Sequence, residues 1–434
     1  MIKILDVRIE ENKMLLKKLL ERNALDDHKI MGQVEEIVNN VKLNGDKALM
    51  YYTEKFDNLK LALDSIVVSR EEIENAYSKI EKDFLKVIQK SIQNIKAFHE
   101  MQKEKSWFST QEEGIMLGQL VNPIENVGIY VPGGTAAYPS SVLMNAIPAK
   151  IAGVKNIYMA TPPKMKGSIS EYILVAANEA GVDKIFKMGG AQAIAAFAHG
   201  TATIPKVDKI VGPGNIYVAM AKKFVYGYCD IDAVAGPSEI TVLADESANP
   251  KFVAADLLSQ AEHDTLASAI LVTNSTSLAQ NVLVEVVEQT KKLSRKEIVE
   301  ESLKNNSAIV IVDNIENGIE LVNKIAPEHL ELCINNPLEH LGKIKNAGAI
   351  FIGNYSSEPL GDYMAGPNHV LPTSGTARFF SPLGVSEFIK KSSLIYYSKT
   401  ALDAIKDDIV LFAAKEGLDA HANAIKVRFL EGDK

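Results

Sequence analysis

The spacing of hydrophobic and polar residues changes along the chain, and it is helical up to about Gly118. Residues three or four positions apart share one face of a helix, so the repeated apolar residues there predict amphipathic helices. The clearest repeats are Val34, Ile37, Val38 and Val41, and later Phe84, Val87, Ile88, Ile92 and Ile95. We expect this first stretch to be mostly helical.

From Asn126 to Gly236 the apolar residues form short runs instead, most of them closed by glycine or proline and several followed by an alanine-rich stretch. The same texture resumes at Ile240. Such runs are typical of buried parallel strands that alternate with helices. The runs are 127–131, 156–160, 184–188, 209–211, 240–244, 268–273, 308–312 and 349–352. The pattern therefore predicts an α/β protein with two such units.

The tail after Ser381 predicts helices and one short strand near residues 393–397. A segment of this length is too short to bury a core of its own. We therefore expect the tail to pack on something else.

Length, composition and charge limit the number of packed units and the class of partner. The chain has 434 residues, with 47% hydrophobic and 24% charged residues. A typical domain has roughly 100–200 residues, so we expect at least two packed globular units. The formal net charge of -8 and the absence of a dense basic run argue against a nucleic-acid partner and favour a small molecule.

No segment predicts export or membrane insertion. The N-terminus soon turns polar, unlike a signal peptide, and no run approaches the roughly 18 apolar residues of a membrane span. We expect a cytoplasmic protein with no membrane partner. Cys229 and Cys333 lie far apart, without a second cysteine nearby, so we interpret both as buried thiols rather than as a disulfide or a thiolate metal site.

The first candidate for chemistry is a helix that Asn249 and Pro250 should open and that should run to about His263. Gln260 and His263 are three residues apart, so both share one face and could reach the same cation. An ordinary solvated helix face often carries the same two residues, and the segment alone does not decide between them.

The second candidate is the adjacent pair Glu328 and His329, which follows Pro327 and precedes an apolar run. Neighbours on a strand point to opposite faces, so the two can meet one reaction centre only in a turn before the strand. An imidazole suits removal of an alcohol proton, and a carboxylate can activate water. A surface acid–histidine pair at a strand entry is the alternative.

Two further segments carry acids beside histidines. The glycine- and proline-rich segment 361–369 contains Asp362 and His369, and the tail contains Glu416 and His421. Loops of the first kind often position metal or substrate ligands. Both segments also fit merely solvated side chains.

The candidate nucleotide segments are rich in glycine, namely 132–134, 189–192 and 212–215. Segment 212–217 has the first two glycines of a dinucleotide fingerprint, but Tyr217 stands in the third place. Glycine-rich turns between strand and helix can hold phosphates with backbone N–H groups. Ordinary tight turns in an α/β sheet would look the same.

Together, eight segments resemble motifs of the histidinol dehydrogenase family, in order along nearly the whole chain. They are residues 130–135, 189–193, 211–215, 235–239, 260–263, 326–329, 366–369 and 416–421. The resemblance implies an NAD-dependent oxidation of L-histidinol through L-histidinaldehyde to L-histidine with two NAD+, the last steps of histidine biosynthesis.

The resemblance also implies which residues do this. One zinc ion per subunit would be held by Gln260, His263, Asp362 and His421, although such donors also accept manganese or cobalt. The ion would bind the amine and imidazole of the substrate and orient it. The other implied substrate contacts are Ser238, His329, His369 and Glu416, and the implied NAD-binding residues are Tyr130, Gln192 and Asn215.

In the implied mechanism His329 removes the hydroxyl proton as hydride passes to NAD. Glu328 then deprotonates a water that attacks the aldehyde, and His329 assists the second hydride transfer. Keeping the aldehyde bound between the steps would prevent its loss to solvent.

The implied fold is two incomplete Rossmann-like α/β/α units with parallel sheets, plus small N- and C-terminal dimerisation segments. We expect an N-terminal helical segment (1–22), a first domain with the metal and catalytic residues (23–128 and 239–380), an inserted NAD-side domain (129–238) and a tail (381–434). The tail would be exchanged between the subunits of a homodimer, so that each active site is composite.

Three rival interpretations remain at this point. A relative could oxidise another amino alcohol or a hydroxy acid, but Glu416 and His369, expected to hold the amine and imidazole end, speak against it. A zinc hydrolase would use Glu328 with a metal-bound water and would not reduce NAD. A non-catalytic metal-binding protein would need no base pair such as Glu328 and His329.

Overall fold

The structure is a computed structural model, which describes residues 2–20, 28–133, 137–164 and 167–430. Gly134 and Thr135 of the 130–135 motif, and residues 21 and 22 of the predicted N-terminal segment, lie outside the described residues. The chain divides into two compact units. Unit 1 is Met1–Gln102 with Ile124–Phe388, and unit 2 is Lys103–Pro123 with Ile389–Lys434.

Unit 1 contains a six-stranded sheet in the order β1-β11-β10-β9-β12-β13, in which every pairing is parallel. Its strands are β1 (Lys3–Asp6), β9 (Glu239–Ala244), β10 (Ser268–Thr273), β11 (Ala308–Ile311), β12 (His329–Cys333) and β13 (Ala349–Ile352). One face packs on α10 (Pro250–Ala261), α11 (Thr276–Thr290) and α12 (Lys296–Asn305), and the other packs on α1 (Glu10–Leu20) and α13 (Ile315–Ile325). The short helix α14 (Glu358–Tyr363) lies against α10.

Unit 1 also contains a five-stranded parallel sheet in the order β6-β5-β4-β7-β8. Its strands are β4 (Asn126–Tyr130), β5 (Asn156–Thr161), β6 (Lys184–Lys187), β7 (Lys209–Val211) and β8 (Asp230–Ile231). The helices on one face are α4 (Arg70–Tyr77), α5 (Lys82–Glu100), α6 (Pro139–Ala152) and α7 (Glu171–Ala180). Those on the other are α2 (His28–Asn44), α3 (Asp46–Asp57), α8 (Gly190–His199) and α9 (Ile216–Val225).

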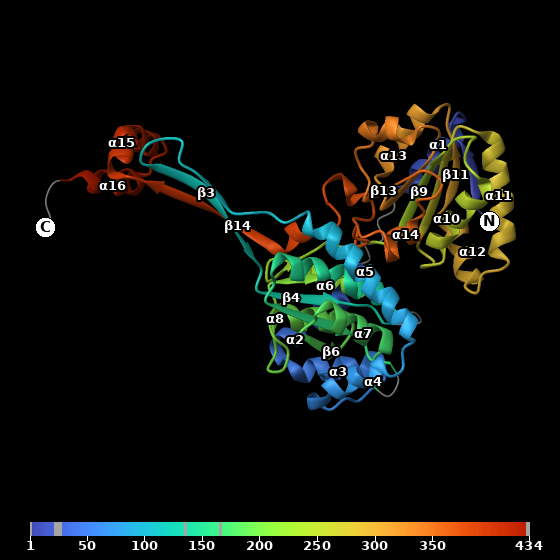
Figure 1. Cartoon of the computed structure of the whole chain (residues 1–434), viewed down its shortest axis with the longest axis horizontal. Helices are drawn as coiled ribbons and strands as arrows, with labels where there is room; N and C mark the ends of the chain where they lie inside the picture. The colour runs from blue at the N-terminus through green and yellow to red at the C-terminus, as the bar shows by residue number, and fades with distance from the viewer. Residues whose placement is uncertain (1, 21–27, 134–136, 165–166, 431–434) are drawn as a thin grey trace. The chain divides into compact units, whose positions relative to one another are not determined.

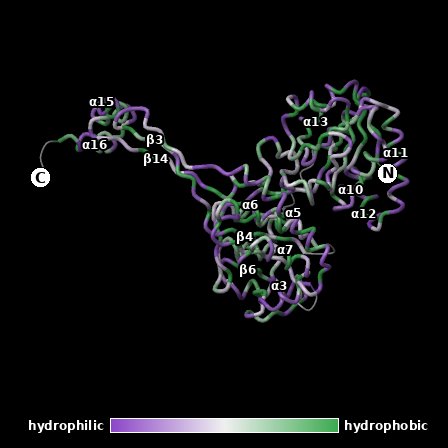
Figure 2. The backbone as a smooth tube through the Cα atoms, in the orientation of Figure 1, coloured by the Kyte–Doolittle hydropathy of each residue, from purple (hydrophilic) through white to green (hydrophobic). Residues whose placement is uncertain are grey.

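The predicted α/β class with parallel sheets is confirmed, and each predicted apolar run contains a strand. The predicted grouping of residues 23–128 with 239–380 differs from the structure. The apolar faces of α2 to α5 belong to the two cores around the five-stranded sheet, and Figure 1 shows these helices beside that sheet. Hydrophilic and hydrophobic residues are interspersed along these helices (Figure 2). Such a pattern predicts that one helix face is buried, but not which sheet covers it.

Unit 2 is built on an antiparallel sheet in the order β14-β3-β2. Its elements are β2 (Trp107–Ser109), β3 (Ile115–Pro123), β14 (Ile389–Tyr397), α15 (Lys399–Lys415) and α16 (Asp419–Lys426). The first stretch was therefore predicted wrongly as helical near its end, because residues 107–123 are mostly strand. The tail also begins later than predicted, since Leu383, Val385 and Phe388 lie in a core of unit 1.

The structure also bears on the two cysteines and on membrane-spanning helices. Cys229 and Cys333 are buried free thiols, as predicted. Within the described part of the chain, no helix combines the length and the apolar character that crossing a bilayer requires.

A buried ion pair supports the turn that follows β7. Lys222 of α9 pairs with Asp232, and their side chains are 2% and 7% exposed. The Lys222 Nζ donates to the carbonyl of Gly212 at 3.0 Å, and the N–H of Gly212 donates to Asp232 Oδ2 at 2.8 Å. Gly212 has φ +113°, and a Cβ there would lie 2.1 Å from the carbonyl oxygen of Tyr130. Only glycine fits this turn, and the ion pair holds both sides of it.

We predict that Lys222→Met destabilises unit 1 by about 3–5 kcal/mol, because it leaves the buried Asp232 carboxylate without its partner. Urea unfolding followed by far-UV circular dichroism measures this, since the single tryptophan, Trp107, lies in unit 2. The exposed neighbour substitution Lys223→Met is the control. Lys222→Met combined with Asp232→Asn should regain most of the loss, and equal stability of Lys222→Met and wild type would contradict the role of the pair.

Candidate active site

The predicted helix with Gln260 and His263 is confirmed as α10. The Asn249 side chain accepts from the N–H of Lys251 at 2.9 Å and caps the helix, which ends two residues before His263. Gln260 is 1% exposed, and neither polar atom of its amide has a hydrogen-bond partner among the described residues. A buried amide without a partner costs free energy, so this side chain indicates a ligand site.

Glu328 and His329 are held by one residue of the neighbouring strand. Glu328 lies in a bend directly before β12 and His329 is the first residue of that strand, so the predicted turn is confirmed. The Glu239 N–H donates to Glu328 Oε2 at 2.8 Å, and the Glu239 carbonyl lies 2.9 Å from His329 Nδ1. A carbonyl only accepts, so Nδ1 carries the ring proton and Nε2 keeps its lone pair.

Both side chains are buried, and burial shifts their titration in opposite directions. Burial lowers the pKa of His329 to about 4, and it raises the pKa of the Glu328 carboxyl well above its usual range. The imidazole is therefore neutral near pH 7 and able to accept a proton. A carboxylate with a raised pKa is a stronger base than an ordinary one when it is ionised.

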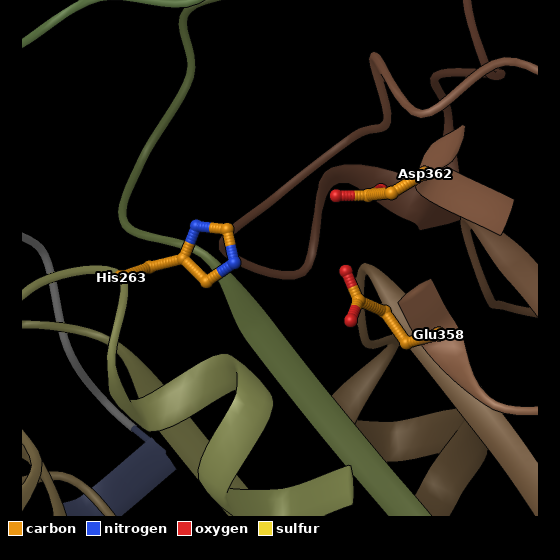
Figure 3. Close-up of side chains that lie close together, drawn as sticks. All are labelled: His263, Glu358 and Asp362. Atoms are coloured by element: carbon orange, nitrogen blue, oxygen red, sulfur yellow. The ribbon is translucent and has the colours of Figure 1, made fainter. Parts of the chain in front are cut away.

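A cluster of potential metal ligands lies beside this pair. One ligand atom from each of His263, Glu358 and Asp362 lies within 4.8 Å of those of the other two, and Figure 3 shows both carboxylates directed toward the His263 ring. His369 Nδ1 lies 3.5 Å from Asp362 Oδ1. Burial alone would raise the pKa of Asp362, but the imidazoles of His369, His329 and His263 outweigh it and keep this pKa below the usual range.

These groups gather at the amino ends of β9 and β12, and the last turn of α10 supplies Gln260. Ligands of open parallel sheets usually bind at the carboxyl ends of the strands. Here the groups lie at the opposite ends of the strands because of the direction of α10. This helix returns antiparallel to β9, so its carboxyl end, with Gln260, lies nearest Glu239 and His329.

The expected nucleotide residues follow the carboxyl ends of strands in the five-stranded sheet. Tyr130 ends β4, Gln192 lies in the first turn of α8 and Asn215 precedes α9. The Tyr130 hydroxyl accepts from the N–H of Gly190 at 3.0 Å, and the Asn215 side chain caps α9. Gln192 is 1% exposed, and its Oε1 has no hydrogen-bond partner among the described residues. From β4 the chain adds β5 and β6 on one side, and it then returns to add β7 and β8 on the other side of β4. Parallel sheets commonly bind nucleotides at such a reversal of strand order.

The remaining predicted residues lie elsewhere. Ser238 directly precedes β9, next to the Glu239 backbone that holds the acid–base pair. Glu416 and His421 belong to unit 2, where both are exposed.

The sequence and the fold are similar to those of known proteins. Residues 20–429 match the sequence pattern of the family described as histidinol dehydrogenase. The chain is 60% identical to the histidinol dehydrogenase of Clostridium acetobutylicum over 95% of both chains. It is 58% identical to that of Caldanaerobacter subterraneus subsp. tengcongensis over 99% of both. The crystal structure of histidinol dehydrogenase from Elizabethkingia anophelis superposes with a TM-score of 0.90, at 43% identity and with 95% of both chains covered.

The chain belongs to the histidinol dehydrogenase family. The family predicted from the eight motifs is thus confirmed, and the family is NAD- and zinc-dependent. The described residues fit both groups. The orphaned Gln260 amide beside an imidazole and carboxylates suits a zinc ion, and the orphaned Gln192 amide at the turn of the five-stranded sheet suits a nucleotide.

Sequence reasoning missed one residue of the site. Glu358 is 2% exposed and shares the cluster of potential metal ligands with His263 and Asp362. It was not among the site residues predicted from the sequence. The available signal was its spacing from Asp362, because carboxylates four residues apart lie on one face of a helix.

Proposed function

We propose that this chain is a histidinol dehydrogenase that oxidises L-histidinol through L-histidinaldehyde to L-histidine with two NAD+, in the last steps of histidine biosynthesis. The observation that carries the proposal is the buried acid–base pair Glu328 and His329, fixed by Glu239 beside a cluster of metal ligands. Relatives of that name are 58–60% identical over nearly the full length. A cytoplasmic location remains a prediction.

The two cofactors would divide the chemistry between them: NAD accepts hydride, while zinc orients the amine and imidazole of the substrate. The chain's own residues move the protons. His329 Nε2, the nitrogen with the lone pair, would accept the hydroxyl proton of the alcohol. Glu328 would accept a proton from the water that adds to the aldehyde. The imidazole of His329 is neutral near pH 7, because burial lowers its pKa to about 4, so Nε2 keeps the lone pair that this step needs.

The ligand and substrate assignments are also proposals. Gln260, His263 and Asp362 in unit 1, with His421 from unit 2, would hold the zinc. All four would also contact the substrate, together with the remaining contacts Ser238, His329, His369 and Glu416. Tyr130, Gln192 and Asn215 would bind NAD. The orphaned amides of Gln260 and Gln192 support this division into a metal side and a nucleotide side.

We further propose a homodimer in which unit 2 serves the partner's active site. Among the described residues of unit 2, the fully buried apolar ones are only Ala413 and Ala422. Many of its large apolar side chains are exposed, namely Trp107, Phe108, Leu117, Leu120, Ile395, Tyr396, Leu411, Phe412, Leu418, Val427 and Leu430. A segment with so small a core needs cover from another surface to be stable.

The test of the function is a spectrophotometric assay of NADH formed from histidinol. We expect activity in the purified protein, its loss after zinc removal by a chelator, and its return on adding zinc. Full activity of the metal-free protein would overturn the zinc assignment. The absence of NADH formation with zinc present would overturn the dehydrogenase and favour a hydrolase or a binding protein.

The roles of Glu328 and His329 predict two different defects. His329→Asn should slow both oxidations by about 10²–10⁴-fold, because both need its proton transfer. Glu328→Gln should spare the first oxidation and cripple the second, since only aldehyde oxidation needs activated water. A single-turnover experiment should thus yield two NADH per histidinol from wild type and one from Glu328→Gln. Normal completion of both steps by Glu328→Gln would contradict the assignment.

The exchanged tail predicts that two inactive proteins can complement each other. His421→Asn and His329→Asn proteins are unfolded and refolded together. In a mixed dimer with exchanged tails, one site collects both lesions and the other collects neither, so about half the wild-type activity per mixed dimer should return. If each subunit uses its own tail, every site keeps one lesion and no activity returns, which would reject the exchange.

A further inference from the structure

Asp57, the last residue of α3, carries a carboxylate that its surroundings do not satisfy. Its Oδ2 atom is buried and has no hydrogen-bond partner among the described residues. Burial raises the pKa of this carboxyl to about 6, so the group is ionised at pH 7. The carboxyl end of a helix also disfavours a negative charge. The carboxylate is therefore a cost to the fold, and such groups gather at functional sites.

The direction of α3 places Asp57 near the start of α8. The first residue of α3, Asp46, accepts at Oδ2 from the Thr203 hydroxyl at 2.9 Å, just beyond the end of α8. The two helices pack together, so they run antiparallel and the end of α3 approaches the start of α8. The Tyr130 hydroxyl, which accepts from the N–H of Gly190, is also there. Burial raises the pKa of Tyr130 to about 12, and the charge of Asp57 adds to this rise.

These neighbours of Asp57 belong to the nucleotide side of the site. Gln192, in the first turn of α8, is 1% exposed, and its Oε1 has no hydrogen-bond partner among the described residues. Backbone N–H groups at a helix start suit the phosphates of a nucleotide. The carboxylate of Asp57 suits a different part, because it repels phosphate and can only accept hydrogen bonds. It requires an uncharged donor, such as a ribose hydroxyl.

The position of α3 indicates which half of NAD this donor belongs to. The nicotinamide must reach the substrate at the catalytic pair, and the segment beside that pair contacts α6. Asn368, next to His369, donates to the Met144 carbonyl of α6 at 2.7 Å. Helix α6 covers one face of the five-stranded sheet and α3 covers the opposite face. Asp57 therefore lies on the face that suits the adenosine half.

The acid that commonly binds this ribose is missing from its usual place. In dinucleotide-binding units an aspartate or glutamate about 20 residues after the first strand-to-helix turn accepts from the ribose 2′-hydroxyl. Here the first strand is β4 and the next is β5, yet residues 131–170 contain no aspartate or glutamate. Asp57 provides a carboxylate from another element, on the same face of the sheet as the Tyr130 side chain.

We propose that the Asp57 carboxylate accepts a hydrogen bond from an adenosine ribose hydroxyl of NAD and makes the site select NAD over NADP. The proposal rests on the nucleotide side of the proposed function and adds a specificity residue to it. A phosphate on the 2′-oxygen, as in NADP, would replace the donor by a negative charge beside the carboxylate. Selection would thus combine a contact to one cofactor with repulsion of the other.

Binding of two cofactor fragments to the full-length protein tests this without an activity assay. The fragments are ADP-ribose and its 2′-phosphate, and isothermal titration calorimetry gives both dissociation constants. Neither carries nicotinamide, so hydride transfer plays no part. Wild type should prefer ADP-ribose. Asp57→Asn should reduce this preference at least about tenfold, because a hydrogen bond to a charged group contributes roughly that much.

A matched substitution and a melting experiment separate selection from support of the fold. Glu54→Gln removes the same charge from an exposed position one turn earlier on α3, and its preference should stay within about twofold of wild type. The pKa of Asp57 is higher in the folded than in the unfolded chain, so its ionised form costs stability above pH 6. At pH 8 Asp57→Asn should therefore melt at or above the wild-type temperature.

The outcomes are distinct. Failure of the wild-type protein to bind ADP-ribose would overturn the nucleotide site of the proposed function. Normal binding with an unchanged preference in Asp57→Asn would overturn the present proposal alone. Equal weakening of both fragments, with a lower melting temperature, would also overturn it, because the carboxylate would then support the fold. If Asp57→Asn does not fold, Asp57→Ala serves instead, with the same expected loss of preference.

Discussion

The site depends on the hydrogen bonds that the backbone of Glu239 makes with the two residues before and at the start of β12. Its N–H fixes Glu328 and its carbonyl fixes the tautomer of His329. Both contacts follow from the parallel pairing of β9 with β12, in which His329 is opposite Ile240. A shift of this register would separate the acid from the base and turn the ring, so the chemistry is determined by strand pairing.

The same register also determines which face of the six-stranded sheet carries the site. Side chains alternate along β12, so His329 and Glu331 face α10 and α14, while Leu330 and Leu332 belong to the core beneath α13. His329, the proposed base, therefore lies on the same side of the sheet as the candidate metal ligands of α10 and α14. The other side remains an apolar support. The buried polar side chains of β12 on the α10 face are tolerated because they are hydrogen-bonded, as Glu331 is to the N–H of Glu358.

The sequence predicts the local elements well because apolar runs and helical spacing reflect local burial. It cannot assign α2 to α5 to a sheet, since an amphipathic face fits any apolar surface. It also misses β3, whose residues are only partly buried and therefore lack a clear apolar alternation. In the site, Pro327 indicates the turn that unites Glu328 and His329. Glu358 escapes notice because an acid at a helix start is commonly an exposed favourable charge, and its burial comes from tertiary packing.

One of the segments that join the two halves of unit 1, residues 232–238, is short and is fixed at several points. Asp232, at its start, binds the backbone of Gly212 and pairs with Lys222, so the link begins at the nucleotide-side turn. Further along, the Gly236 N–H donates to Thr373 Oγ1 at 2.6 Å, and the Ser238 carbonyl accepts from Ser268 at 3.0 Å. The next residue is Glu239, which holds the acid and the base. A short segment with hydrogen bonds at both ends therefore connects the Gly212 turn to the backbone of Glu239, which holds the proposed catalytic pair.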